Sequence, residues 1–211
     1  MAVVLLAALT GCRQQPESAA VSCSLSRRGV ALGRSDGIEY AYRDHANHRV
    51  YVSSDAGIEV WDADNGAPVG RIHNIVGSTA IVTAPPLNRG FAADGTTGAI
   101  KVFDLDTLEI IRRIPYADPS SDMVFDATTG TVAAISAVAR DVRLIDAAAG
   151  VVVGDVRLAG SPRAMWSRGN GMLYLRLERP ARIVRVNLGA RKVDARWPWA
   201  ACKSRRDLID H

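Results

Sequence analysis

The chain has 211 residues, which is enough for one sizeable domain that buries most of its apolar side chains. It carries 26 lysines and arginines against 22 aspartates and glutamates, and this formal net charge of +4 is too small to indicate a polyanion partner by itself. The three cysteines form no CxxC motif and no Cys/His cluster with zinc-like spacing, so we expect no metal site, and no motif indicates another cofactor.

Residues 1–11 form an apolar run, about the length of a signal-peptide core and too short to span a bilayer. The run ends in LTG followed by Cys12, which resembles the lipobox of bacterial lipoproteins. This resemblance implies a signal peptide over residues 1–11, a lipid on Cys12 and a tether over residues 12–20. No lysine or arginine precedes the run, so an ordinary cleaved signal, a start further upstream and a cytosolic N-terminus stay open. Either kind of signal predicts a periplasmic or outer-membrane-anchored protein.

The next stretch leads into the predicted domain, which spans residues 21–211. Apolar residues alternate over 21–25, which is typical of a strand. Residues 33–37 match the G-x-S-x-G nucleophile elbow, but that motif needs a helix after the serine. Apolar residues alternate over 38–42 instead, which indicates a strand. We therefore predict a turn at 33–37 and no catalytic residue.

Four short segments with one shared pattern organise the rest of the chain. They are residues 58–62, 100–104, 142–146 and 183–187, and their last residues are 42, 42 and 41 positions apart. A period of about 40–50 residues is typical of β-propeller blades. β-Branched and aliphatic runs separated by Gly, Asn, Asp and Pro indicate antiparallel strands, and no segment has a convincing helical period. We therefore predict an all-β propeller of four consecutive four-stranded antiparallel blades.

Each of these four segments ends in an aspartate or asparagine, namely Asp62, Asp104, Asp146 and Asn187. A short Asx side chain at the start of a turn accepts a hydrogen bond from a backbone N–H two residues on. With one such residue in each blade, they would lie far apart. We therefore expect them to stabilise turns and not to form an acidic site.

Four segments carry more specific motifs. They are residues 49–53 (RVYVS), 88–91 (NRGF), 102–108 (VFDLDTL) and 195–202 (ARWPWAAC). These motifs resemble the repeats of the YVTN/YncE-like family of bacterial seven-bladed β-propellers, and the resemblance extends over residues 37–202. It implies an extracytoplasmic propeller used for binding or scaffolding.

The predicted blades span residues 37–75, 78–117, 119–160 and 161–202, and residues 203–211 resemble the start of a further blade. Seven blades of this length need roughly 300 residues, so the chain carries about four of seven. We expect a partial propeller that is a fragment of a longer ring. A small closed ring and an open arc, whose strand edges would be uncovered, are the alternatives.

Few side chains suggest a site. His45 and His48 stand three residues apart between two strands, where a turn does not preorganise metal ligands. Propeller ligands usually bind where connections from successive blades converge. Arg163 and Arg179 lie in two such connections and are the candidates for binding an anion, because guanidinium suits carboxylate and phosphate. Ordinary loop arginines are the competing interpretation.

The expected function is non-enzymatic binding or scaffolding at the bacterial cell envelope, with a small ligand or an envelope protein as partner and the membrane reached only through the lipid anchor. One alternative is a lactonase-type or cofactor-dependent propeller enzyme whose site lies in missing blades. Another is polyanion or nucleic-acid binding by the basic fourth blade, since residues 161–206 hold twelve lysines and arginines against two acids. In an oxidising compartment, Cys23 and Cys202 could form a disulfide.

Overall fold

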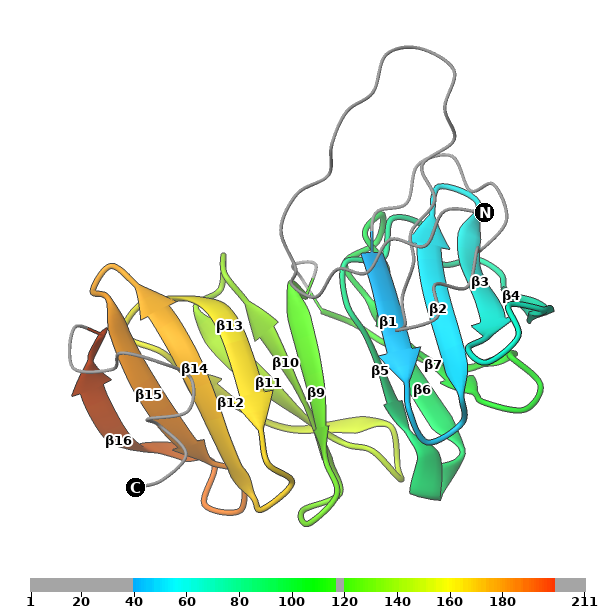
Figure 1. Cartoon of the computed structure of the whole chain (residues 1–211). Helices are drawn as coiled ribbons and strands as arrows, with labels where there is room; N and C mark the ends of the chain where they lie inside the picture. Colours follow the sequence, from blue (N-terminus) through cyan, green and yellow to red (C-terminus); the bar gives the residue numbers. More distant parts are fainter. Residues whose placement is uncertain (1–39, 117–119, 200–211) are drawn as a thin grey trace, which may run out of the picture.

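The structure is a computed structural model that describes residues 40–116 and 120–199. Its strands form four sheets that follow one another along the chain (Figure 1). The predicted signal peptide, Cys12, the tether, the strand at 21–25, the turn at 33–37, the Cys23–Cys202 pair and residues 203–211 lie outside the described residues. Within the described part of the chain, no helix has the length and apolar character needed to cross a membrane.

The sixteen strands of the described residues divide equally among the four sheets. The first blade contains β1 (Tyr40–Asp44), β2 (Arg49–Ser54), β3 (Gly57–Asp62) and β4 (Pro68–Ile72). The second contains β5 (Ile81–Ala84), the short 3-10 helix η1 (Pro85–Leu87), β6 (Arg89–Ala93), β7 (Ile100–Asp104) and β8 (Ile110–Ile114). The third contains β9 (Asp122–Asp126), β10 (Thr131–Ser136), β11 (Asp141–Asp146) and β12 (Val151–Arg157). The fourth contains β13 (Ser161–Ser167), β14 (Met172–Glu178), β15 (Arg182–Asn187) and β16 (Lys192–Pro198).

Within each sheet the strands pair in chain order, and all pairs for which the register is defined are antiparallel. The first strands of successive blades contact one another, β1 with β5, β5 with β9 and β9 with β13, so they form the inner edge of the array. This arrangement confirms the predicted fold of four consecutive four-stranded antiparallel blades.

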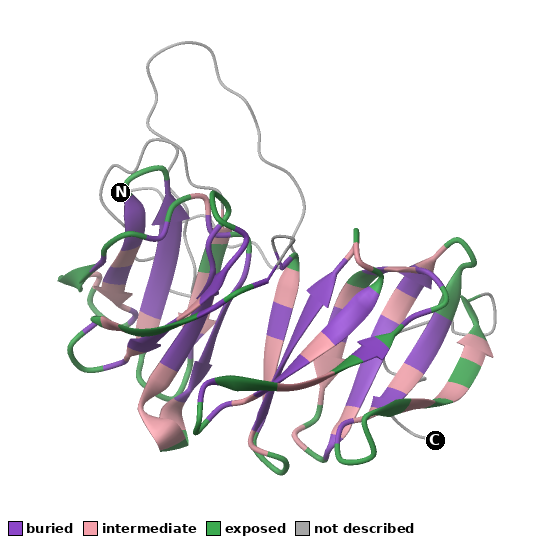
Figure 2. Cartoon of the chain, turned by 180° about the vertical axis from the view of Figure 1, so that it is seen from behind, coloured by how far each residue is buried: buried purple, intermediate pink, exposed green. Residues whose placement is uncertain are grey.

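The hydrophobic core lies between the blades, because alternate residues of a strand point to opposite faces of its sheet. In the first blade Tyr51 packs toward the second blade, in one cluster with Ile81 and Phe103. Val50 and Val52 point the other way and belong to a separate cluster. A larger cluster joins the second, third and fourth blades. Figure 2 shows the buried residues concentrated in the middle strands of the sheets.

The Asx residues at the ends of the third strands stabilise the following turns, as predicted. Asp62 and Asp104 each accept hydrogen bonds at 2.9 Å from the backbone N–H groups two and three residues on. Asp146 and Asn187 accept a hydrogen bond from the N–H three residues on, at 2.7 and 2.8 Å. The four side chains are therefore occupied in four separate turns, and their structural role is confirmed.

A buried carboxylate joins the third blade to the fourth. Asp126, at the end of β9, is fully buried and accepts hydrogen bonds from Ser167 Oγ at 2.8 Å and from the N–H of Gly171 at 3.0 Å. The N–H and hydroxyl of Thr129 donate to its other oxygen at 3.0 and 3.1 Å. Burial raises the pKa of Asp126, but the donors from Ser167, Gly171 and Thr129 outweigh burial and hold the pKa below its ordinary value.

Candidate functional site

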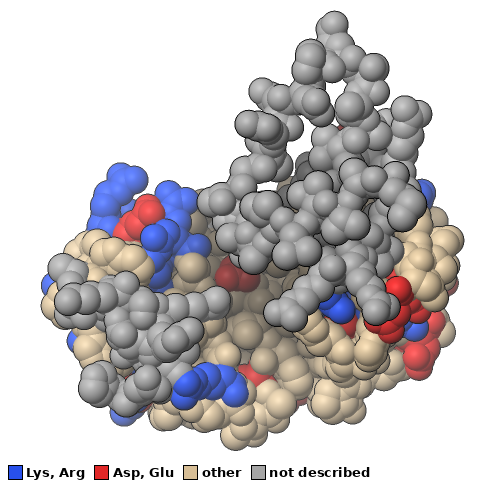
Figure 3. Space-filling view, viewed as in Figure 1, with Lys and Arg blue, Asp and Glu red and all other residues tan. Residues whose placement is uncertain are grey.

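A pocket of about 270 Å³ lies at one end of the third and fourth blades. Strands of a blade alternate in direction, so the β10–β11 turn, the β14–β15 turn and the start of β13 all lie at this end. The pocket is lined by Ala137, Val138, Arg140, Ser161, Arg163, Glu178 and Arg179. In Figure 3 basic side chains surround a small acidic patch at the upper left, over this end of the fourth blade.

Arg163 is held at the pocket by an irregularity in β13. The register between β13 and β14 shifts between Pro162 and Ala164, so Arg163 has no direct partner in β14. Its Nε lies 2.9 Å from Oε2 of Glu178, and the two side chains are 50% and 38% exposed. This ion pair fixes the direction of the guanidinium, although an exposed pair contributes little to stability.

Arg140 and Arg179 are the two other basic groups of the pocket, and both are exposed. Each stands in a turn with a left-handed backbone, at φ angles of 54° and 52°, a conformation that non-glycine residues rarely adopt. Neither makes an ion pair with another described residue. The pocket therefore holds three guanidinium groups against the single carboxylate of Glu178, and two of the three are unpaired.

Two close contacts involve the backbone at the pocket. The hydroxyl of Ser161 donates a hydrogen bond to the carbonyl oxygen of Ala137 at 2.9 Å, across the seam between the blades. Gly160 lies so close to the β14–β15 turn that a Cβ at this position would be 2.8 Å from the carbonyl oxygen of Glu178. The spacing of the arginines thus depends on tight backbone packing, which a larger residue at position 160 would disturb.

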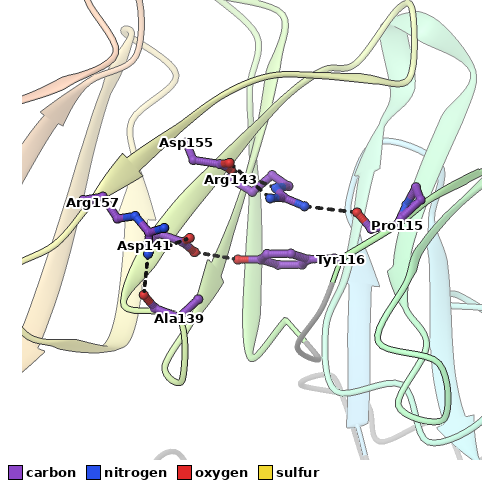
Figure 4. A network of polar contacts seen from close by, with 7 residues as sticks. All are labelled: Pro115, Tyr116, Ala139, Asp141, Arg143, Asp155 and Arg157. Atoms are coloured by element: carbon purple, nitrogen blue, oxygen red, sulfur yellow. Dashed lines mark hydrogen bonds and ion pairs between the residues drawn. The ribbon is translucent and has the colours of Figure 1, made fainter.

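A polar network with buried Tyr116 and Asp141 at its centre anchors one side of the β10–β11 turn (Figure 4). The hydroxyl of Tyr116 donates to Asp141 Oδ1 at 3.0 Å, and the guanidinium of Arg143 lies over the Tyr116 ring at 4.4 Å. Arg143 also binds both oxygens of Asp155, at 2.8 and 3.1 Å, and the carbonyl oxygen of Pro115 at 3.0 Å. Burial and the charge of Asp141 raise the pKa of Tyr116, so this phenol stays a hydrogen-bond donor.

The same network reaches the residue next to Arg140 in the turn. Arg157 donates to the carbonyl oxygen of Ala139 at 3.3 Å, and its guanidinium lies 3.9 Å from Oδ2 of Asp141. The backbone N–H of Ala139 in turn donates to Ser136 Oγ at 2.9 Å. These contacts fix the backbone on both sides of Ala139, so Arg140 projects from a well-anchored turn.

This arrangement is suited to binding an anion. Guanidinium groups form charge-assisted hydrogen bonds with carboxylates and phosphates, and a volume of about 270 Å³ is at the small end for a ligand pocket. The hydroxyl of Ser161 is engaged with a backbone carbonyl, and the Glu178 carboxylate faces Arg163. In the part of the chain that the structure describes, no three His, Cys, Asp or Glu side chains are grouped so as to hold a metal ion.

The structure brings Arg163 and Arg179 together in one pocket, although they are sixteen residues apart in a stretch where two other arginines also occur. Arg140 was missed by the sequence reasoning. Its turn is the counterpart, one blade earlier, of the turn that holds Arg179, and the repeat alignment could have identified it. His45 and His48 lie in the β1–β2 turn, where His48 Nδ1 is 2.8 Å from Asp64 Oδ2 and both side chains are 63% exposed.

Comparison with known proteins supports the fold and leaves the activity open. No family model matches the sequence, and no curated protein matches it. Among solved structures, hydrazine synthase of Kuenenia stuttgartiensis is similar with a TM-score of 0.68 and 14% identity, over 76% of this chain and 48% of that chain. The dihydro-heme d1 dehydrogenase NirN is similar with a TM-score of 0.65 and 18% identity, over 80% of this chain and 38% of that chain. The chain thus spans less than half the length of either structure, and what it shares with both is the β-propeller fold.

Proposed function

We propose that the chain is a non-enzymatic binding module whose pocket between the third and fourth blades takes a small carboxylate or phosphate. One observation carries this proposal: Arg140, Arg163 and Arg179 converge from three separate backbone segments around one pocket and face a single carboxylate. Two of these guanidinium groups have no acidic partner among the described residues, so an anion would supply the missing charge.

The setting that we propose for this module is the bacterial cell envelope. The motif at residues 9–12 supports export and lipid attachment at Cys12, and the motifs at 49–53 and 195–202 support membership of the YVTN/YncE-like group. Replacing Cys12 by alanine should move the protein from the membrane fraction to the soluble fraction of the cells that produce it. An unchanged distribution would refute lipid attachment, without bearing on the pocket.

Calorimetric titration with inorganic phosphate and with succinate tests the binding proposal. Arg179→Ala should weaken binding of the better anion roughly 10- to 100-fold, because one charge-assisted hydrogen bond contributes about 1.5–3 kcal/mol. The matched control is Arg168→Ala, which removes an exposed arginine of the same blade from the turn between β13 and β14, at the opposite end of the sheet. The proposal fails if neither anion binds, or if both substitutions weaken binding equally.

The enzyme alternative has a specific but weak basis. Both similar solved structures are named for enzymes, hydrazine synthase and a dehydrogenase, at identities of 14% and 18%. Identities this low carry over a fold and not a reaction. The binding role is therefore preferred, because it draws on side chains that this chain places around its own pocket.

A further inference from the structure

Two neighbouring turns at the pocket end of the blades combine arginines with exposed apolar residues. The β10–β11 turn spans residues 137–140 and reads AVAR. The β14–β15 turn, with the first residue of β15, spans residues 179–182 and reads RPAR. Neither stretch contains an acidic residue. Because Val138, Arg140 and Arg179 all line the anion pocket, the two turns lie side by side around it.

The apolar side chains of these two turns face solvent. Val138 is 76% exposed, the highest value among the large hydrophobic residues that the structure describes, and the next is Ile111 at 50%. In the neighbouring turn Pro180 and Ala181 are also exposed. A single exposed valine is ordinary on a protein surface, but here three exposed apolar residues stand in two adjoining turns. A partner that covered them would remove apolar area from water without disturbing the core.

Three arginines of these turns have no acidic partner. Arg140, Arg179 and Arg182 are exposed, and none of them forms an ion pair with another described residue. Arg182 pairs across the sheet with Leu177, which belongs to the core cluster that joins the fourth blade to the third. Directly paired residues lie on the same face of a sheet, so Arg182 lies on the side of the fourth blade that faces the third.

The equivalent turns of the first two blades have a different composition. The β2–β3 turn consists of Asp55 and Ala56, and the β6–β7 turn spans residues 94–99 and reads DGTTGA. Neither turn contains an arginine or a lysine, and Asp55 is an exposed acid. Among the four described turns at this end of the blades, unpaired arginines beside exposed apolar residues therefore occur in the two that line the pocket.

An anionic membrane surface matches both the charge and the apolar character of these turns. Lipid headgroups carry the phosphates with which guanidinium groups form charge-assisted hydrogen bonds, and the boundary below the headgroups accepts apolar side chains of surface-bound proteins. Each arginine near such a surface strengthens binding about fivefold. A dissolved anion would also pair with the arginines, but it would leave Val138, Pro180 and Ala181 in water.

We infer that this end of the third and fourth blades docks on an anionic membrane surface, with a lipid phosphate in the pocket and Val138 among the headgroups. The inference rests on the proposed anion pocket, and it names a phospholipid headgroup as the source of the anion. The contact adds to the lipid anchor proposed at Cys12, and it determines which end of the blades faces the bilayer.

Cosedimentation with vesicles tests the docking, on the full chain with Cys12→Ala so that no attached lipid contributes. The protein should bind vesicles of two parts phosphatidylcholine and one part phosphatidylglycerol roughly 100-fold more tightly than pure phosphatidylcholine, because three arginines contribute about fivefold each. Arg182→Ala should weaken binding to the anionic vesicles about fivefold, and Val138→Asn roughly tenfold. Val138→Trp should strengthen it, because tryptophan favours the membrane interface.

Matched controls show whether this particular end of the blades makes the contact. Arg168→Ala removes an exposed arginine from the β13–β14 turn, at the opposite end of the fourth blade. Val69→Asn changes a valine of β4 that is 43% exposed. Both variants should bind the anionic vesicles as the parent protein does.

Calorimetric titration of the same proteins separates the docking from the pocket. Arg182 does not line the pocket, so Arg182→Ala should bind inorganic phosphate as the parent does while it loses affinity for vesicles. If neither phosphate nor succinate binds, the pocket itself is refuted. If phosphate binds but the anionic vesicles do not, the docking alone is overturned. Equal binding to neutral and anionic vesicles, or vesicle binding that neither Val138→Asn nor Arg182→Ala weakens, would also overturn the docking.

Discussion

Replacement of Asp126 by asparagine should markedly destabilise the folded chain. The asparagine is nearly isosteric, but it exchanges one accepting oxygen for an NH2 group that faces existing donors. Asp126 is fully buried; one of its oxygens accepts from Thr129 in the β9–β10 turn of the third blade, and the other accepts from Ser167 and Gly171 at the β13–β14 turn of the fourth. No solvent is at hand to compensate for a donor that loses its acceptor.

The expected loss in the free energy of unfolding follows from the donors that have no acceptor other than Asp126. The hydroxyl of Ser167 also lies 3.1 Å from the carbonyl oxygen of Met172 and can turn toward it. The backbone N–H groups of Gly171 and Thr129 cannot turn away. Gly171 donates to one oxygen of Asp126 and Thr129 to the other, so the new NH2 group takes the acceptor from one of these two N–H groups. A hydrogen bond to a charged group contributes about 1.5–3 kcal/mol, which is the predicted loss. This is an appreciable part of the roughly 5–15 kcal/mol that stabilises a typical domain.

Urea unfolding, followed by tryptophan fluorescence, measures the difference in unfolding free energy between the wild type and Asp126→Asn. The pH dependence of this difference checks whether it comes from the Asp126 carboxylate. The pKa of Asp126 is lowered on folding, so its contribution is present above the ordinary value of 3.8 and is lost as pH falls through the lower folded pKa. The gap between the wild type and Asp126→Asn should therefore be full at pH 7 and shrink below about pH 4. A gap under about 0.5 kcal/mol at pH 7, or one that stays constant on acidification, would refute the reasoning.

Three further outcomes are expected. Gly160→Ala puts a Cβ 2.8 Å from the Glu178 carbonyl oxygen, so it should lower the melting temperature and weaken phosphate binding. The control is Gly154→Ala, whose Cβ meets only a flexible side chain at 3.5 Å and should change neither quantity. Tyr116→Phe leaves buried Asp141 without its phenol donor and should cost about 1–3 kcal/mol in urea unfolding; an unchanged midpoint would contradict the anchoring role of the network. A 20-base-pair DNA duplex should not bind at 150 mM salt, and binding that weakens steeply with added salt would instead favour the polyanion alternative.

The blade architecture could be predicted because it repeats locally. The third-strand segments recur at 42, 42 and 41 residues, and an Asx residue ends each one, so fold class and the Asx turns followed from spacing and turn chemistry alone. No long-range information was needed for either. The same repeat predicted that Arg163 and Arg179 lie in connections; Arg179 does lie in the β14–β15 turn, but Arg163 lies within β13, at the register shift between Pro162 and Ala164.

The pocket itself could not be predicted, because it depends on contacts between blades. Arg140 comes from a turn that the sequence marks only as a connection, and this turn is joined to the start of β13 by the hydrogen bond from Ser161 to the carbonyl oxygen of Ala137. Whether Arg163 would be free or paired depended on the register shift beside it, which spacing does not reveal. The Tyr116 network is likewise a product of packing between the second and third blades.

Contacts that join only successive blades also determine how the molecule opens. The first strands meet in the order β1, β5, β9, β13, and among residues 40–116 and 120–199 the second blade is the one blade with which the first shares a core cluster. In such a linear array each blade is stabilised by contacts with its immediate neighbours. Local unfolding therefore starts at a terminal blade and spreads one blade at a time. Amide hydrogens of β2 and β3 should therefore exchange with deuterium faster than those of β10 and β11, and a protease should release the first blade while the second to fourth blades remain folded.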